Sequence, residues 1–229
     1  MKVAALWTGG KDSSLACYKI LKRRFDVAFA MTFIWDQPSM AHPLPMIKLQ
    51  SDVLGIPFYW ERVAPPYFEA YRQAILGLKQ EYDIEGVVTG DISYVDSFHG
   101  NWLDDVCKGT GVEVIKPLWE QNRLKIVQDV VSSGFRVIFT CVKEPWFSEE
   151  WLGRTIDEQS IKELQALNEE TGMDICGENG EYHTMTVDAP FYTRAINVSK
   201  FETEKITNAY LMKSMDISLA PKKMARLDV

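Results

Sequence analysis

The chain has 229 residues, of which 46% are hydrophobic and 25% charged, and its formal net charge is −7. These proportions are typical of a folded globular protein with one large domain, or with one domain and a smaller appendage, and they exclude an intrinsically disordered chain. The acidic balance argues against free nucleic acid as a partner, because nucleic-acid binders carry a basic surface.

The first part of the chain alternates patterns of strands and helices. The opening run Val3–Trp7 is continuously apolar, as in a parallel strand that is buried on both faces. Such alternation predicts an α/β fold, a parallel twisted sheet with helices on both faces in a Rossmann-like arrangement. The expected strands are 3–7, 27–33, 58–63, 86–90, 112–115 and 136–142, and the expected helices are 15–24, 46–54, 67–82, 102–108 and 124–131.

The pattern changes after residue 143. An aromatic-rich loop contains Trp146, Phe147 and Trp151, which form either core or a lid over a substrate. Asp157 is expected to cap a helix that ends at Gly172. A loop at 177–184 and two β-rich segments, 193–204 and 206–218, complete this part. We therefore predict two units, a nucleotide-binding domain at 1–143 and a smaller C-terminal α+β region at 144–229 that binds substrate.

Cysteine usage and hydropathy indicate the compartment. The four cysteines are far apart and form no C-x-x-C pair, so we expect reduced, buried thiols. No stretch approaches the ~20 apolar residues of a membrane span, and the apolar run at the N-terminus is shorter than that of a signal peptide. A cytoplasmic protein without a membrane partner is the expectation.

A glycine pair lies where the first strand passes into the first helix, in the segment Thr8-Gly9-Gly10-Lys11-Asp12-Ser13. Glycines let the backbone turn sharply and approach a ligand closely, and the helix N-terminus offers free N–H groups to a phosphate. Thr8 and Ser13 add hydroxyl donors, Lys11 adds a positive charge, and Asp12 or Ser13 can cap the helix. The segment matches neither the P-loop nor the dinucleotide fingerprint G-x-G-x-x-G.

This segment resembles the S-G-G-x-D-S loop of the N-type ATP pyrophosphatases, the PP-loop or adenine nucleotide alpha hydrolase-like superfamily. The resemblance implies that the loop binds the pyrophosphate of ATP, that Asp12 helps to hold Mg²⁺, and that adenine lies against Met31, Thr32 and Phe33. Gly90, at the exit of the strand at 86–90, is expected to border the nucleotide too.

The remaining motifs resemble one family of that superfamily, the diphthine–ammonia ligases, and they follow the family's order over most of the chain. These motifs are Leu54-Gly55-Ile56-Pro57, Gly90-Asp91-Ile92, Pro117-Leu118-Trp119, Glu150-Trp151-Leu152-Gly153-Arg154 and Gly177-Glu178-Asn179-Gly180-Glu181-Tyr182-His183-Thr184. The resemblance implies an AMP-forming amide ligase. A carboxylate attacks ATP, pyrophosphate leaves, and ammonia displaces AMP from the acyl-adenylate. The family's acceptor is diphthine on elongation factor 2.

The second loop suits that chemistry. Glu178 and Glu181 are three residues apart in a turn flanked by glycines, and they could bind Mg²⁺, orient ammonia or accept its proton. We assign Asp12 and Glu178 to the metal, and Lys11, Asp12, Glu178 and Glu181 to catalysis. His183 is either a proton shuttle, a substrate contact or a structural histidine.

Weaker candidates and alternative functions stay open. Asp91, His99 and Trp102 could line the mouth of the pocket, and Arg154 could bind an anion or form a plain salt bridge. The function is either ligation on diphthine, the same chemistry on another carboxylate, or nucleotide sensing without catalysis. The expected partners are ATP, ammonia and elongation factor 2, and a homodimer is compatible with the sequence.

Overall fold

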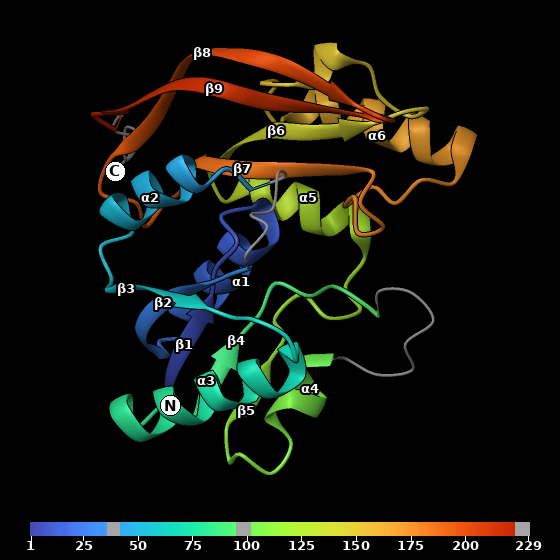
Figure 1. Ribbon diagram of the computed structural model, residues 1–229. Helices are drawn as coiled ribbons and strands as arrows, with labels where there is room; N and C mark the ends of the chain where they lie inside the picture. Colours follow the sequence, from blue (N-terminus) through green and yellow to red (C-terminus); the bar gives the residue numbers. More distant parts are fainter. Residues whose placement is uncertain (36–41, 95–101, 223–229) are drawn as a thin grey trace.

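Five parallel strands form the first sheet of the computed structural model, which describes residues 1–35, 42–94 and 102–222 (Figure 1). All four strand pairs are parallel, and β1 lies in the centre. The predicted α/β class is confirmed. In spatial order the strands are β3 Phe58–Arg62, β2 Asp26–Ile34, β1 Lys2–Leu6, β4 Gly86–Val88 and β5 Glu113–Ile115.

Helices cover both faces of this sheet because successive residues of β1 point to opposite sides. Val3 and Ala5 pack in one core cluster with residues of α1 and α5, whereas Ala4 packs in a second cluster with residues of α3 and α4. The helices around the sheet are α1 Lys11–Lys22, α2 Leu44–Val53, α3 Tyr67–Tyr82, α4 Trp102–Cys107 and α5 Arg123–Ser132. Among the described residues, no helix is long and apolar enough to cross a membrane.

A second, antiparallel sheet has the order β7-β6-β9-β8. Its strands are β7 Tyr182–Asp188, β6 Arg136–Lys143, β9 Ala209–Ala220 and β8 Ala195–Ile206. The sequence places β6 in the alternating parallel part, and this is wrong, because β6 pairs with β7 and β9. The domain boundary after residue 143 stays a prediction. Along the chain, the last strand of the first sheet ends at Ile115 and the first strand of the second sheet begins at Arg136.

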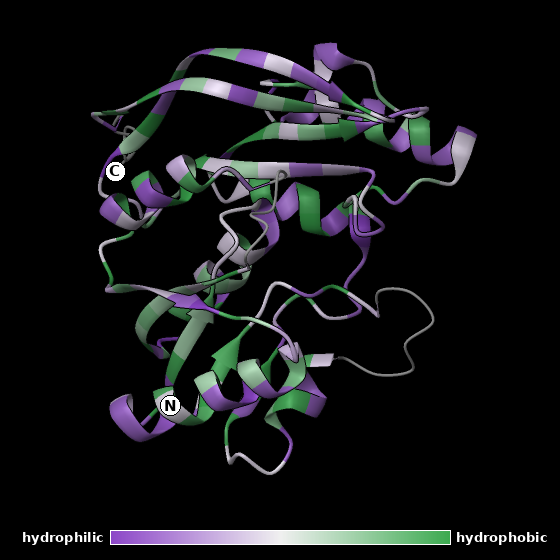
Figure 2. Cartoon of the chain, viewed as in Figure 1, coloured by the Kyte–Doolittle hydropathy of each residue, from purple (hydrophilic) through white to green (hydrophobic). Residues whose placement is uncertain are grey.

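The two sheets face each other across α1, α2 and α5 (Figure 1). One continuous core joins them, with Leu15 of α1, Ile126 of α5, Phe139 of β6 and Met185 of β7 in the same cluster. Strand β6 carries mostly apolar residues, whereas the hairpin of β8 and β9 mixes apolar and polar residues along its length (Figure 2). The N-terminus of α1 is thereby held between the sheets.

The region after β6 is built as core. Phe147 and Trp151 are buried and pack against Phe139, Trp151 edge-on at 5.2 Å between ring centroids. Arg154 forms an ion pair with Glu163 at 2.6 Å and lies over the Trp151 ring, so it is engaged within this region.

Helix α6, Glu158–Thr171, has the predicted ends. Asp157 and Ser160 form a capping box, in which each side chain accepts a hydrogen bond from the backbone N–H of the other. Gly172 follows the helix with φ +75°, the left-handed conformation that favours glycine.

Candidate active site

The glycine-rich loop lies at the carboxyl end of β1, between β2 and β4. This is the point where the strand order reverses direction, and ligands of open α/β sheets bind there. Gly9 has φ +80°, and a Cβ at this residue would lie 2.3 Å from Gln50 Oε1, so only glycine fits. Helix α1 begins at Lys11 with Gly10 as its N-cap and no side-chain cap, so the prediction that Asp12 or Ser13 caps it is wrong.

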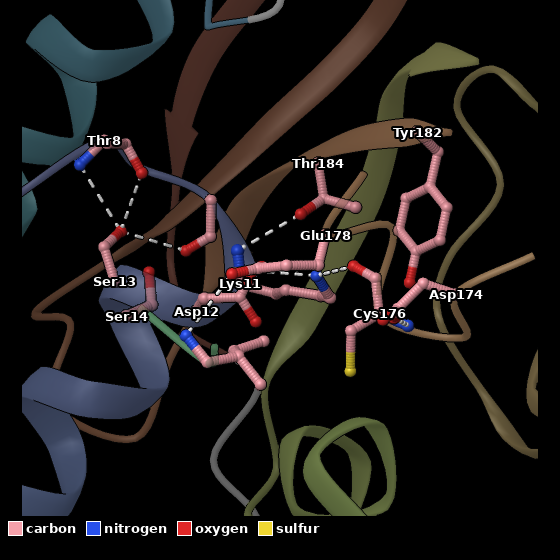
Figure 3. A network of polar contacts seen from close by, with 12 residues as sticks. Thr8, Lys11, Asp12, Ser13, Ser14, Asp174, Cys176, Glu178, Tyr182 and Thr184 are labelled. Atoms are coloured by element: carbon pink, nitrogen blue, oxygen red, sulfur yellow. Dashed lines mark hydrogen bonds and ion pairs between the residues drawn. The ribbon is translucent and has the colours of Figure 1, made fainter. Parts of the chain in front are cut away.

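The hydroxyl groups of the loop contact each other at the start of α1. Thr8 donates its hydroxyl to Ser13 Oγ at 3.2 Å, and Ser13 donates to the Gly10 carbonyl at 3.2 Å (Figure 3). Thr8 is exposed whereas Ser13 is buried. These bonds shape the turn.

Strand β7 supports the loop from the second sheet. The backbone N–H of Lys11 donates to Thr184 Oγ1 at 3.1 Å, and the N–H of Thr186 donates to the Gly9 carbonyl at 2.9 Å. Gln50 of α2 donates to the same Gly9 carbonyl at 2.8 Å and to the Thr186 carbonyl at 2.8 Å. The glycine-rich turn is therefore held in place by both β7 and α2.

Lys11 does not reach out toward a ligand. Its side chain is only 4% exposed, and its Nζ lies 2.8 Å from Asp12 Oδ2 and also donates to the Cys176 carbonyl (Figure 3). The ammonium lies 5.2 Å from the centroid of the Tyr182 ring. Burial alone would lower the pKa of Lys11, but the charges of Asp12 and of neighbouring groups outweigh it and raise the pKa, so the side chain is protonated. Lys11 therefore links the two loops through its bonds to Asp12 and Cys176, and its predicted contact with a phosphate stays a prediction.

A cavity of about 590 Å³ opens beside the loop, a size suited to a nucleotide. It brings together many of the predicted residues, and it also contains Asp91, Trp102 and others that the sequence marked only weakly or not at all. His99 lies outside the described residues. Predicted residues in the cavity wall are Thr8, Asp12, Ser13, Met31, Thr32, Phe33, Gly90 and Glu178; further wall residues include Trp35, His42, Tyr71, Thr89, Asp91 and Trp102.

One side of this cavity is aromatic. The rings of Phe33 and Tyr71 lie 4.0 Å apart between centroids, and Trp102 packs edge-on against Tyr71 at 4.6 Å. A flat purine ring suits such a wall, since aromatic faces stack. Tyr71 and Trp102 come from α3 and α4, and no sequence motif marks Tyr71 as a site residue.

Gly90 contacts the loop directly. A Cβ at this residue would lie 2.6 Å from both the Asp12 carbonyl carbon and the Ser13 nitrogen, which are backbone atoms. Close approach of two backbones therefore explains the glycine.

We expect Gly90→Ala to weaken ATP binding about 10-fold or more, because the added methyl group displaces the Asp12–Ser13 backbone, and overpacking of this kind costs about 1–3 kcal/mol. Calorimetry with ATP measures the effect. Gly77→Ala is the matched control, because Gly77 lies in α3 with no atom within 4 Å of its added Cβ. Unchanged ATP affinity in Gly90→Ala would contradict this role.

The structure separates the two glutamates of the second loop. Glu178 borders the cavity, and its Oε1 accepts a hydrogen bond from the Ile92 N–H at 3.4 Å. Glu181 is 2% exposed and does not border the cavity; its Oε1 accepts bonds from the Asp174 N–H at 2.9 Å and from the Asn179 side chain at 3.2 Å. Glu181 thus holds the loop in shape, and we revise its expected catalytic role accordingly.

Asp12 and Glu178 offer oxygens to a cation. Burial raises the pKa of both carboxyl groups, and in Glu178 the charge of Asp12 adds to the effect. Asp12 Oδ1 is buried without a hydrogen-bond partner. No group of three or more His, Cys, Asp or Glu that could hold an ion occurs among residues 1–35, 42–94 and 102–222. Mg²⁺ commonly binds one or two carboxylates together with substrate phosphates, so this pair fits it.

His183 does not line the cavity. Its ring centroid is 5.4 Å from that of His42, a cavity residue that the sequence did not single out. Burial together with the charges of Lys11 and Lys143 lowers the pKa of His183 to about 4, so the ring is neutral at neutral pH. A contact between His183 and substrate stays a prediction.

Comparisons with known proteins cover nearly the whole chain. The model of the diphthamide synthase N-terminal domain matches residues 1–114, and that of the diphthamide synthase C-terminal domain matches residues 122–216. Together the two models match well over half of the residues.

Individual relatives have the same name, diphthine–ammonia ligase. The Danio rerio protein is 28% identical over 232 residues, covering 89% of this chain and 88% of its own length, and the Mus musculus protein is 26% identical, covering 88% and 84%. The Schizosaccharomyces pombe relative is 26% identical, but the match spans only 36% of its length. Among solved structures, a predicted subunit of a tRNA methyltransferase from Methanocaldococcus jannaschii aligns with a TM-score of 0.41 at 15% identity, over 83% of this chain and 98% of the other.

Proposed function

Because the chain belongs to the diphthamide synthase family, we propose that it is an ATP-dependent amide ligase that converts diphthine on elongation factor 2 to diphthamide. The substrate carboxylate attacks the α-phosphorus of ATP, and pyrophosphate leaves. Ammonia then attacks the acyl-adenylate and displaces AMP. The names of the relatives support the acceptor, and this chain's own cavity supports the ATP chemistry.

The observation that carries the proposal is the position of Glu178 in the wall of the cavity that Asp12 and Ser13 also line. A protein that only binds the nucleotide needs the glycine-rich loop at Thr8 to Ser13 alone, and an acidic side chain beside it would repel the phosphates. Its presence is favourable when a cation neutralises the charge that gathers as a carboxylate attacks ATP.

Each part of the site has a separate task. The N-terminus of α1 and the hydroxyls of Thr8 and Ser13 bind the phosphates, and the aromatic wall with Met31 and Phe33 binds adenine. Asp12 and Glu178 would hold Mg²⁺, which supplies positive charge at the phosphates. Residues from about 144 onward contribute Glu178 and the supporting strand β7, and we propose that they also contact the acceptor. Since elongation factor 2 works in the cytoplasm, we propose that location.

The nucleotide product tests this chemistry. We expect ATP to be converted to AMP and pyrophosphate when an acceptor and ammonium are both present, since adenylation releases pyrophosphate. Chromatography of the nucleotides, with a parallel assay for pyrophosphate, makes the measurement, and omission of the acceptor is the control. Acceptor-dependent release of ADP and phosphate would overturn the proposal.

A further inference from the structure

His42 places an unpaired nitrogen at the phosphate-binding loop. Its Nδ1 is buried and has no hydrogen-bond partner, and the side chain borders the cavity. A Cβ built on Gly10 would lie 3.5 Å from His42 Cε1, so the imidazole lies directly against the turn that cradles phosphate. Buried polar nitrogens are normally paired, and an unpaired one in a cavity wall points to a ligand.

The surroundings keep the ring neutral. Burial lowers the pKa of His42 to about 3, and the neighbouring His183 and the charge of Lys11 add to the effect. A neutral imidazole carries one N–H donor and one acceptor nitrogen. His42 can therefore donate a hydrogen bond to an anion although it carries no charge.

The side of the sheet on which His42 lies indicates which part of a nucleotide it meets. Its neighbours Gly10 and His183 belong to the loop and to strand β7 behind it. Phe33 and Tyr71, the expected adenine wall, pack with the core cluster on the opposite face of the first sheet. Phosphate, rather than the base, is the group within reach of His42.

We propose that His42 donates a hydrogen bond from Nδ1 to a phosphate oxygen of the nucleotide and remains bound to pyrophosphate as it leaves. This inference rests on the proposed ATP binding and adds a phosphate ligand from outside both sequence loops. Because Lys11 is engaged with Asp12 and Cys176, His42 takes the place of the side-chain donor that Lys11 was expected to supply.

Calorimetry with pyrophosphate and, separately, with adenosine tests the proposal on the full chain in the presence of Mg²⁺. We expect His42→Ala to weaken pyrophosphate binding about 10-fold or more, the scale of one hydrogen bond to a charged group, and to leave adenosine binding unchanged. His42→Asn should recover most of the affinity, because its side-chain amide presents an N–H near the position of Nδ1.

Three results would overturn the inference: unchanged pyrophosphate affinity in His42→Ala, an equal loss for adenosine, or no recovery in a His42→Asn protein that unfolds at the wild-type temperature. A wild-type protein that binds neither ligand would instead overturn the proposed nucleotide site itself. The failure of the inference and the failure of the proposed function are thus distinguishable.

Discussion

Replacement of Glu178 by glutamine is expected to lower the rate of amide formation by about 100-fold or more, the usual scale for an acid–base or metal-binding group in a reaction centre. Glutamine keeps the size of the side chain and can still accept the Ile92 N–H bond, so the change removes the charge alone. ATP affinity should fall much less, because the glycine-rich loop at Thr8 to Ser13, the proposed phosphate site, is unchanged. Mass spectrometry of the amide product and calorimetry with ATP give the two values.

Glu181→Gln is the matched control, since the same substitution is made three residues away in the same loop. Its carboxylate is bonded to Asp174 and Asn179 and does not border the cavity. We expect a lower unfolding temperature and amide formation within about 10-fold of wild type, because the main loss is one set of hydrogen bonds to a charged group. Equal rates for Glu178→Gln and wild type would remove Glu178 from the ligation step.

The variants also separate two roles for Glu178. If Glu178 holds Mg²⁺ with Asp12, Glu178→Gln needs a higher Mg²⁺ concentration for half-maximal rate and regains activity when Mg²⁺ is raised. If it accepts a proton from ammonium, added Mg²⁺ restores nothing, and the rate rises with pH as free ammonia supplies the nucleophile. A magnesium titration at two pH values decides between them.

Replacement of Lys11 by methionine is expected to destabilise the fold by about 3 kcal/mol, the lower end of the range for breaking a buried ion pair, because Asp12 keeps some contact with solvent. The change leaves the Asp12 carboxylate and the Cys176 carbonyl without their shared cation. Urea unfolding monitored by circular dichroism measures the free energy of unfolding. The sequence-based expectation differs, because there the positive charge of Lys11 serves a phosphate rather than the fold.

Lys19→Met, two turns along the same helix, is the control. Lys19 is paired with Asp129 at 2.7 Å, and its side chain is 22% exposed, so we expect a loss of less than about 1 kcal/mol, as for partly exposed pairs. Equal free energies of unfolding for Lys11→Met and wild type would show that the bonds of Lys11 to Asp12 and Cys176 contribute no stability.

Local signals predicted the loop and the wall beside it. A continuous apolar run, a glycine pair and a following helix define a strand-turn-helix unit within a dozen residues, and the structure has β1, Gly9 and α1 in those places. The end of β2 at Met31 to Phe33 borders the cavity because parallel neighbours end at the same edge of the sheet.

Two features could not be predicted from the neighbouring sequence: the burial of Lys11 and the position of His42 in the cavity wall. The carbonyl that accepts the hydrogen bond of Lys11 belongs to Cys176, 165 residues away, and the sequence near Lys11 does not indicate this partner. The sequence around His42 contains prolines and has no periodicity, so its direction depends on how the chain enters α2. Similarly, Glu178 and Glu181 differ only through the turn around Gly177 and Gly180, which both have positive φ.

Strand β6 shows a different limit. Its apolar run at 137–142 suits a strand in either sheet, since burial on both faces gives the same pattern whatever the direction of its neighbours. Its antiparallel partners β7 and β9 lie later in the chain, and only pairing in three dimensions assigns it to the second sheet.

The most direct test of the central claim follows a labelled nitrogen. Elongation factor 2 that carries diphthine is incubated with the protein, ATP, Mg²⁺ and isotopically labelled ammonium, and the modified peptide is examined by mass spectrometry. The proposed function predicts that the label enters as an amide at the diphthine carboxylate, only when ATP is present. Bound ATP without any labelled amide, in a protein that is folded, would contradict ligation of diphthine and favour either another carboxylate acceptor or a nucleotide sensor.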